Sequence, residues 1–410
     1  MKKLISFIII CLFIIPGVFA FEDFYSFDEP EEGFRIKDRK FEMGFGAGVN
    51  IANDFLSVNK IFQDTVILDL DDLSLGLRME AGAEVPWHFN INFRTWGVGL
   101  FAKLEATGAL GLNGDMLSFK QATNKKSDFN SAVFMSIGVD SFFYIQDFKV
   151  RFKPAVFYPI LYVVPDRLSY TYNSTTEGTN LGIDYDIRVY TAFALGEDGM
   201  ADSFSLTASP GFDFSVGIEY PLSEKTGLKN TVPILDFDIG LDLVNIPIVG
   251  AKMNNYILIN GVISGNGENL EDFLDSFDME QDTSFEDGSS GGIERAFKMY
   301  VWANWYPLNG ITKSRDFFTV TPVLGFAINT LYIDPFSMEV GIRARLNMAN
   351  LFFAGAGINY EDRIWRNSLM LGINSRAFEL NIGADLRSQD FLSSWTANGF
   401  DLNIGMKFGW

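Results

Sequence analysis

The chain of 410 residues contains one cysteine, Cys11, and one histidine, His88. Cys11 lies in an apolar run near the N-terminus and follows Ile10 rather than a small residue, which argues against a lipid-modified cysteine. Disulfides and cysteine-based metal or nucleophile sites are therefore excluded from the rest of the chain. His88 follows Pro86 and Trp87 at a predicted turn, and no nucleophile motif accompanies it. We therefore expect no catalytic residue and no enzyme.

Long apolar runs and positive charges are also scarce. After the N-terminal run, no apolar segment approaches the ~18 residues that a transmembrane helix needs, so a membrane-spanning form of this chain would be a barrel. Lys and Arg total 32 against 52 Asp and Glu, and the formal net charge is −20. Such a charge repels phosphates and argues against nucleic acid as a partner. Phe (41) and Gly (38) are abundant, which is typical of a many-stranded β protein.

The first twenty residues have the features of a secretory signal peptide. Met1-Lys2-Lys3 is basic, residues 4–15 are apolar, and residues 16–20 end in a small-residue cleavage site. We predict cleavage after Ala20 and export from the cytoplasm. Residues 21–40 form an acidic, irregular lead-in to the rest of the chain.

From residue 41 onward, apolar and polar residues alternate with the period of two that is typical of β-strands. Ten residues at ~3.3 Å each, tilted by ~45°, span ~23 Å, close to the ~25 Å apolar band of an outer-membrane barrel. Fifteen or sixteen segments fit this pattern, depending on one weak candidate at 255–262. The segments are 41–51, 73–85, 93–110, 133–145, 149–158, 185–195, 212–220, 235–243, 255–262, 297–305, 317–329, 338–348, 351–360, 368–374, 378–387 and 400–410.

Even strand numbers are the rule in bacterial single-chain barrels. We predict an all-β fold over residues 41–410, a transmembrane antiparallel up-and-down β-barrel of about 14 strands, with a range of 12–16. One or two short helices are expected in loops, one after Asn53 and one over residues 270–277, where apolar residues recur at helical spacing. Longer loops are expected at 111–131, 166–184 and 265–292.

The last strand alternates most strongly. Phe400, Leu402, Ile404, Met406, Phe408 and Trp410 share one face, and small, polar or charged residues share the other. This tail resembles the C-terminal strand of bacterial outer-membrane β-barrels, which ends in an aromatic residue. The resemblance implies that the barrel-assembly machinery recognises Phe408 and Trp410, and that outer-membrane lipid surrounds the protein.

Two features indicate which face of the strands points inward. Glycines recur on the polar face, where they suit a crowded or curved barrel interior, and the tryptophans lie mostly near strand ends, as in interfacial girdles. The polar face also carries charges of both signs. The residues predicted to face the lumen are Asp236, Asp238, Asp242, Arg343, Arg345, Glu379 and Asp385. The alternative is a soluble periplasmic β protein, whose apolar face would form a core.

No metal site or cofactor is expected. Residues 278–282 have the acidic spacing of a calcium loop, but Thr283 stands where that loop needs glycine. Gly44-x-Gly46-x-Gly48 lies inside a strand rather than before a helix, so it is not a phosphate loop.

Three functions fit the predicted barrel. The first is a porin-like channel or transporter for small solutes, with weak cation selectivity from its acidic excess. The second is uptake of hydrophobic compounds such as fatty acids, because size, expected strand number, the helix after the first strand and Phe richness are similar to the FadL-like barrels. Phe101 and Phe353 would then line an apolar pocket. The third is a structural or surface barrel with a closed lumen.

A membrane barrel should resist SDS until it is heated. We expect the detergent-purified protein to migrate differently on a gel before and after boiling, with a β-rich circular dichroism spectrum before heating. Unchanged migration of a protein that stays soluble without detergent would contradict the barrel.

Overall fold

The computed structural model describes most of the chain beyond residue 39. The predicted signal peptide, the acidic lead-in to residue 39, and the helices expected after Asn53 and over residues 270–277 lie outside the described residues, apart from Ser276. The described residues are 40–53, 77–112, 122–126, 128–175, 178–195, 201–267, 276, 278–309, 311–312, 314–328, 336–348, 351–361, 364–375, 377–388, 391–396 and 399–410.

Strands dominate this part of the chain. In chain order they are β1 (Phe41–Asn53), β2 (Leu77–Asn92), β3 (Trp96–Leu112), β4 (Ala122–Lys126), β5 (Asp128–Ile145), β6 (Phe148–Thr175), β7 (Gly178–Thr191), β8 (Phe193–Leu195), β9 (Ala201–Leu206), β10 (Gly211–Tyr220), β11 (Phe237–Val249), β12 (Asn255–Gly267), β13 (Asp278–Asp287), β14 (Phe297–Trp305), β15 (Phe318–Ile328), β16 (Phe336–Met348), β17 (Phe352–Glu361), β18 (Ile364–Asn374), β19 (Phe378–Ser388) and β20 (Gly399–Gly409). The helical turns are α5 (Leu222–Thr226), α6 (Leu228–Thr231), η1 (Arg315–Phe317) and η2 (Ser393–Thr396).

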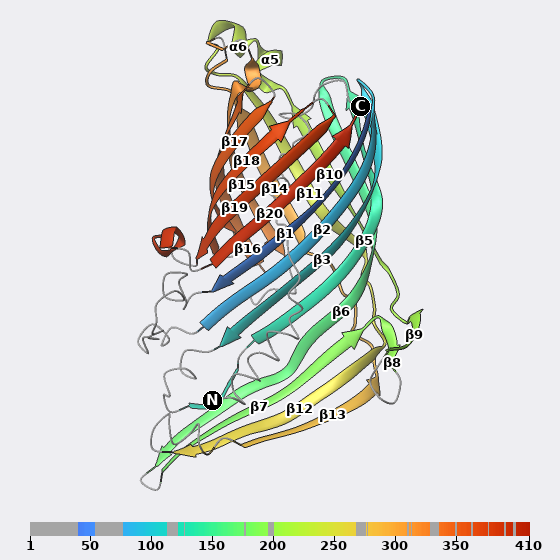
Figure 1. Cartoon of the computed structure of the whole chain (residues 1–410), viewed down its shortest axis with the longest axis vertical. Coiled ribbons are helices and arrows are strands. Elements are labelled where there is room, and N and C mark those ends of the chain that lie inside the picture. The colour runs from blue at the N-terminus through green and yellow to red at the C-terminus, as the bar shows by residue number, and fades with distance from the viewer. Residues whose placement is uncertain are drawn as a thin grey trace.

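Fourteen strands close into an antiparallel barrel, as predicted. The circle runs β1–β2–β3–β5–β6–β10–β11–β14–β15–β16–β17–β18–β19–β20 and returns to β1 (Figure 1). The last strand pairs with the first from Glu42 opposite Gly409 to Ala52 opposite Gly399. The amides of Lys40 and Phe41 donate to the carbonyl of Trp410, at 2.9 and 3.2 Å, which completes the seam. Closure leaves the circle without an unpaired strand edge.

The same sheet continues beyond one mouth of the barrel through strands outside the circle. β6 is 28 residues long, and from Leu161 onward it pairs with β7. β7 then pairs with β12, and β12 with β13, while β4 pairs with the other edge of β6. We call β4, β6 from Leu161, β7, β12 and β13 the outer sheet; it projects below the barrel in Figure 1.

The structure corrects all three predicted loops. Within 111–131, residues 122–126 form β4 and β5 begins at Asp128. Residues 166–184 belong mostly to β6 and β7, and residues 278–287, expected in an acidic loop, form β13. These segments do not show the apolar alternation of the barrel strands, because that alternation is required only where one face meets lipid. Two of the sixteen candidate segments also lie outside the circle, which leaves fourteen for the barrel: 185–195 falls mostly in β7, with 193–195 in β8, and 255–262 falls in β12.

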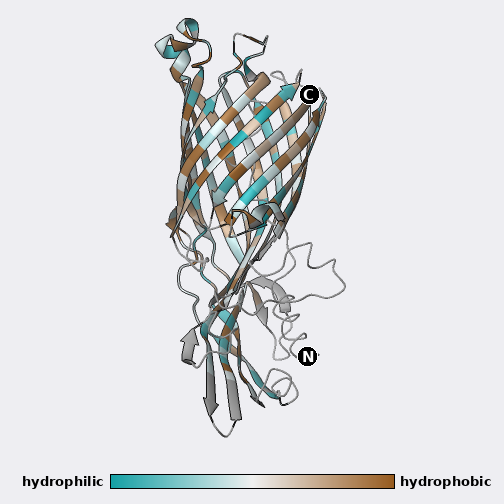
Figure 2. Ribbon diagram, turned by 90° about the vertical axis from the view of Figure 1, so that its left-hand side faces the viewer, coloured by the Kyte–Doolittle hydropathy of each residue, from teal (hydrophilic) through white to brown (hydrophobic). Residues whose placement is uncertain are grey.

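Burial alternates sharply along the barrel strands. In β18, Leu369 and Leu371 are each 66% exposed, whereas Ser368 and Met370 are each 3% exposed. Their neighbours on β19 and β20, Ile382 and Leu402, are also about half exposed, at 51% and 53%. Figure 2 shows the corresponding alternation of hydropathy along the strands. The apolar face therefore points outward from a closed wall and suits lipid, and the soluble alternative does not fit.

The two ends of the barrel differ. Both chain termini of the circle and the short connections 93–95 and 146–147 lie at one end, which we call the turn end; the opposite mouth, with the outer sheet, is the loop end. Aromatic pairs ring the turn end: Phe93 with Trp96 (4.3 Å between ring centroids), Phe148 with Tyr220 (4.8 Å), Phe41 with Trp410 (5.7 Å) and Phe237 with Trp305 (6.2 Å). Such rings are typical of membrane interfaces. No described helix is long and apolar enough to cross a membrane.

An arginine in the middle of the outward face should destabilise the barrel. Leu369→Arg is expected to lower the free energy of unfolding by about 2–4 kcal/mol, because the cation would have to enter the acyl region. Urea titration of protein folded in vesicles measures this change. Glu280→Arg on β13 is the matched control and should have little effect; equal losses in both variants would contradict the lipid-facing assignment.

Candidate functional site

The inner wall of the barrel is the candidate site, because it gathers most of the buried polar side chains. Three of the residues predicted to face the lumen are buried there: Arg343 (7% exposed), Glu379 (2%) and Asp385 (7%), and Arg345 is partly buried. Each lies on the face opposite the exposed apolar residues of its strand. Other buried polar residues on the barrel strands include Glu42, Glu84, Asp213, Asn304, Thr319, Thr321, Glu339, Arg366, Asn381, Arg387, Asp401 and Asn403.

Many of these interior charges form ion pairs. Arg295 donates two hydrogen bonds to Asp213, at 2.8 and 2.7 Å. Lys103 lies 2.6 Å from Glu84 and 3.4 Å from Glu105. Arg387 binds Asp401, and Arg151 binds Asp140. Pairing of this kind offsets the cost of removing charges from bulk water.

Solvent-accessible space remains inside the wall. The side chains of Lys103 and Glu105 each keep 25% of their surface accessible, and that of Arg151 also keeps 25%. These residues alternate with outward-facing neighbours such as Leu104, so their accessible surface belongs to the interior. The barrel therefore contains a lumen that side chains do not fill completely.

Interior rings lie flat against the wall over glycines of the neighbouring strand. Gly372 is directly opposite Phe353, and Gly240 is directly opposite Trp302. A Cβ atom added at either glycine would overlap the facing ring, so no other residue fits there without moving it. This explains why glycines recur on the polar face: they let aromatic rings lie along the wall rather than across the lumen.

Lysine and arginine side chains make cation–π contacts with several of these rings. Lys153 Nζ lies 4.5 Å from the centroid of Phe101, and the Arg295 guanidinium lies 5.3 Å from that of Phe157. Phe101 and Phe353, predicted to line a pocket, are 8% and 2% exposed on the inner face. Trp302 departs from the interfacial girdle expected for most tryptophans: it faces inward at 6% exposure, because Gly240 leaves room for its ring. The inner wall thus combines paired charges with aromatic surface.

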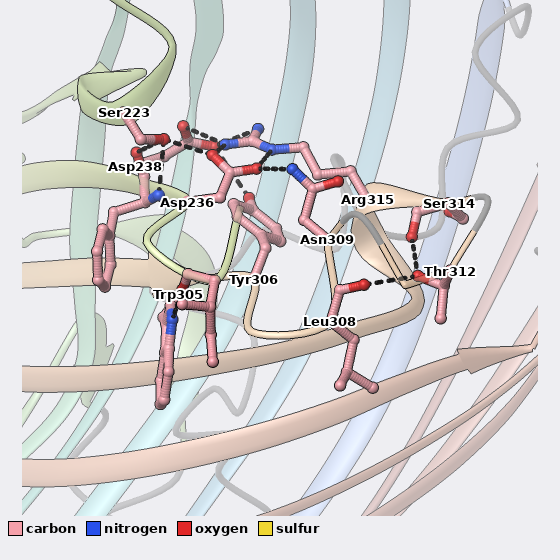
Figure 3. A network of polar contacts seen from close by, with 12 residues as sticks. Ser223, Asp236, Asp238, Trp305, Tyr306, Leu308, Asn309, Thr312, Ser314 and Arg315 are labelled. Atoms are coloured by element: carbon pink, nitrogen blue, oxygen red, sulfur yellow. Dashed lines mark hydrogen bonds and ion pairs between the residues drawn. The ribbon is translucent and has the colours of Figure 1, made fainter. Parts of the chain in front are cut away.

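Asp236 and Asp238 lie at the turn end, where they bind one arginine (Figure 3). Arg315 donates to Asp236 through Nε (2.6 Å) and Nη2 (2.7 Å), and to Asp238 through Nη1 and Nη2 (both 2.8 Å). The guanidinium carbon also lies 3.9 Å from the ring centroid of Tyr306, whose hydroxyl donates to Asp238 at 3.0 Å. We call Asp236, Asp238, Tyr306 and Arg315 the turn-end clamp.

The clamp joins two connections of the barrel. Arg315 begins η1, before β15, whereas Asp236 directly precedes β11 and Asp238 is its second residue. Asn309 Nδ2 donates to Asp236 at 2.7 Å, and Ser223 of α5 donates to the same carboxylate. Burial by itself lowers the pKa of Arg315, but the bonds to Asp236 and Asp238 outweigh it and raise that pKa well above its ordinary value. The arginine therefore stays charged.

The clamp also changes the role expected for these aspartates. Asp236 lies one residue before β11 rather than within it, and Asp242 accepts a bond from Trp302 Nε1 at 2.6 Å. Carboxylates held in this way are occupied by protein groups rather than presented to ions. Arg315 is 79 residues from Asp236 in the sequence, and no spacing pattern connects them, so sequence reasoning missed it.

His88 does not lie at a turn but inside β2. Its Nε2 is 3.4 Å from the carboxylate of Glu42, and its ring covers Gly44. Within the described residues, no group of three or more His, Cys, Asp or Glu side chains is arranged to hold a metal ion.

An aromatic cluster lies where β6 passes from the circle into the outer sheet. It contains Phe134 and Phe157 of the barrel wall together with Tyr190 and Tyr256 of the outer sheet. Tyr162 stacks on Tyr190 with centroids 5.9 Å apart, and Tyr190 contacts Tyr256 at 5.1 Å. The hydrogen bond from Tyr256 to Glu286 (2.6 Å) raises the pKa of Tyr256 and lowers that of Glu286.

Comparisons with known proteins give structural similarities only. No protein-family model and no curated protein matches the sequence. The toluene transporter TodX of Pseudomonas putida matches with a TM-score of 0.49 and 7% identity, covering 92% of this chain and 91% of that chain. The monoaromatic hydrocarbon channel CymD matches with a TM-score of 0.47 and 8% identity, covering 91% and 89%. The NalP translocator domain of Neisseria meningitidis matches at 0.34 and 7%, covering 93% and 92%. The strand pairing described above establishes the barrel independently.

Removing the clamp cation should weaken the turn end. Arg315→Met is expected to lower the free energy of unfolding by about 3–5 kcal/mol, because it leaves two buried carboxylates side by side. Urea unfolding in vesicles measures this loss. Lys225→Ala removes an exposed ion pair with Asp147 at the same end and should change stability little. Equal stability of Arg315→Met and the unmodified chain would contradict the clamp.

Proposed function

We propose that the chain is an outer-membrane channel for small apolar solutes, including aromatic compounds. The observation that carries this proposal is the lumen, whose charges largely pair with one another and whose rings line the wall. Short connections face the periplasm in barrels of this class, so the turn end would be periplasmic and the loop end extracellular. This is the function that the resemblance to FadL-like barrels implies.

The pairing of interior charges favours apolar cargo over ions. An ion-selective pore needs charged groups that remain available to the permeating ion. Here Asp213, Asp401 and Glu84 each bind a cation of the wall, and Asp236 and Asp238 bind Arg315. The weak cation selectivity expected from the sequence is therefore not what this interior favours.

The aromatic cluster supports an entry route at the loop end. Phe157 belongs both to this cluster and to the inner wall, where Arg295 lies over its ring. Packed apolar and aromatic side chains thus continue from the base of the outer sheet to the barrel interior. Pockets for apolar ligands are usually lined in this way, with a few placed polar groups.

Export and assembly remain part of the proposal. Cleavage after Ala20 would release the chain into the periplasm, and Phe408 and Trp410 would serve as the signal for the barrel-assembly machinery. The exposure of both residues, 37% and 74%, at the end of the closing strand is compatible with this role.

The test measures transport with a variant that narrows the lumen. Gly240→Val would displace the ring of Trp302 from the wall, because a Cβ there overlaps it. Gly182→Val is the matched control, since nothing lies within 4 Å of a Cβ added at that position on β7. We expect cells of a diderm host that express the protein to take up a radiolabelled monocyclic hydrocarbon several-fold faster than cells without it. Gly240→Val should abolish most of the gain, and Gly182→Val should retain it.

Contrary outcomes are equally specific. Uptake of the hydrocarbon that does not depend on the protein, together with swelling of protein-containing vesicles in small sugars, would replace the proposal with a hydrophilic porin. Absence of both activities and of conductance would favour the structural barrel with a closed lumen.

A further inference from the structure

One polar residue interrupts the lipid-facing surface of the barrel. Asn367 lies on the outward face of β18, between Trp365 and Leu369 of the same face, and pairs with outward-facing Leu386 of β19. Nevertheless it is only 6% exposed, whereas Leu369 is 66% exposed. An amide facing acyl chains would lose its hydrogen bonds, which is costly. Another part of the chain must therefore cover Asn367 on the outside of the wall.

That cover is η2, in the connection between β19 and β20. Asn367 Nδ2 donates to Ser394 Oγ at 2.6 Å, and Ser394 Oγ in turn donates to the carbonyl of Phe391 at 2.6 Å. Ser394 is fully buried, and η2 contacts both β18 and β19. The helical turn is drawn in red in Figure 1, where it stands outside the layer of strands rather than over the mouth. The connection is thus held against the outer surface of the barrel.

The same turn carries a row of aromatic rings away from the wall. Tyr360 contacts Trp365 with centroids 4.9 Å apart, Trp365 meets Phe391 edge-on at 4.9 Å, and Phe391 meets Trp395 edge-on at 6.5 Å. The outermost residues are strongly exposed: Leu392 at 74%, Trp395 at 54% and Phe391 at 39%. The buried hydrogen bond between Asn367 and Ser394 therefore holds η2 against the wall, and the side of the turn that faces away from the wall is apolar.

We propose that residues 391–396 form a lipid-interface anchor. They insert Leu392 and Trp395 into the boundary between acyl chains and headgroups of the membrane leaflet at the loop end. Phe391 contacts Trp365 on the outward face of β18, so their apolar surface adjoins the lipid-facing band of Leu369, Ile382 and Leu402, which identifies lipid as the occupant. Trp is enriched at such boundaries because its ring is apolar and its N–H is polar. The anchor holds the loop-end mouth at a fixed height in the membrane.

A spin label at Leu392 tests the anchor directly. Cys11 is the only cysteine, so the full chain with Cys11→Ser and Leu392→Cys takes one label. Leu369→Cys in the outward band and Glu280→Cys on β13 are the matched lipid and water controls. In vesicles, the label at residue 392 should collide with oxygen several-fold more often, relative to a water-soluble nickel complex, than the label at residue 280. Its ratio should lie between those of the two controls.

Two results would overturn the proposal. A ratio at residue 392 equal to that at residue 280 would place the turn in water. Spin–spin broadening that disappears when unlabelled protein is added would show that a second copy of the chain, not lipid, covers it. If Leu392→Cys does not fold, as judged by the gel shift on heating, Trp395→Phe provides the second measurement. The fluorescence of the unmodified chain minus that of this variant gives the emission of Trp395. Lipids brominated near the headgroup should quench that emission strongly, and lack of quenching overturns the proposal. Neither readout depends on solute transport, so failure here leaves the proposed channel function untouched.

Discussion

The structure depends on one constraint, that every backbone N–H and C=O inside a membrane must be bonded within the protein. A sheet satisfies this requirement only when its last strand pairs with its first. Here the seam between β1 and β20 extends from Glu42 to Ala52, and the carbonyl of Trp410 accepts the amides of Lys40 and Phe41. With all backbone groups bonded, the side chains of the barrel strands form an apolar outer set and a polar inner set. The outer sheet lies beyond the mouth, so its side chains need not follow this pattern.

The interior then faces a second requirement, because it encloses charges between walls that exclude bulk water. The chain meets it locally. Arg295 binds Asp213, Lys103 binds Glu84 and Arg387 binds Asp401, so each cation has an anion within hydrogen-bonding distance. Each of these pairs contains one cation and one anion, so the acidic excess of the chain lies elsewhere. The exposed carboxylates of β13, such as Glu280 and Asp282, lie instead on the outer sheet, where water surrounds them.

The barrel strands were predictable because lipid imposes a period of two on each of them, and the count of fourteen followed once two segments were removed. Those two, in β7 and β12, show the limit of prediction from alternation: alternating hydropathy indicates a strand with one apolar face, but it does not indicate whether the strand belongs to the closed barrel. β13 was missed because neither of its faces meets lipid. The turn-end clamp was beyond sequence reasoning, since Arg315 and Asp236 meet only through the pairing of β11 with β14. Asp236, Asp238 and Asp242 were predicted to face the lumen; their binding to Arg315 and Trp302 depends on geometry that no sequence pattern shows.

Residues that break the alternation are therefore the most informative positions, because a polar side chain facing lipid or an aromatic ring in the polar interior requires a specific partner. Trp302 is an aromatic residue on the polar face, and Gly240 opposite it accounts for its position. Asn367 is an amide on the apolar face, and Ser394 accounts for it by carrying η2 onto the wall. In each case a residue that breaks the pattern is matched by a partner on a different strand or connection. The same reasoning accounts for Phe391, Leu392 and Trp395 in the connection after β19: η2 covers an amide on one side and presents these apolar side chains on the other.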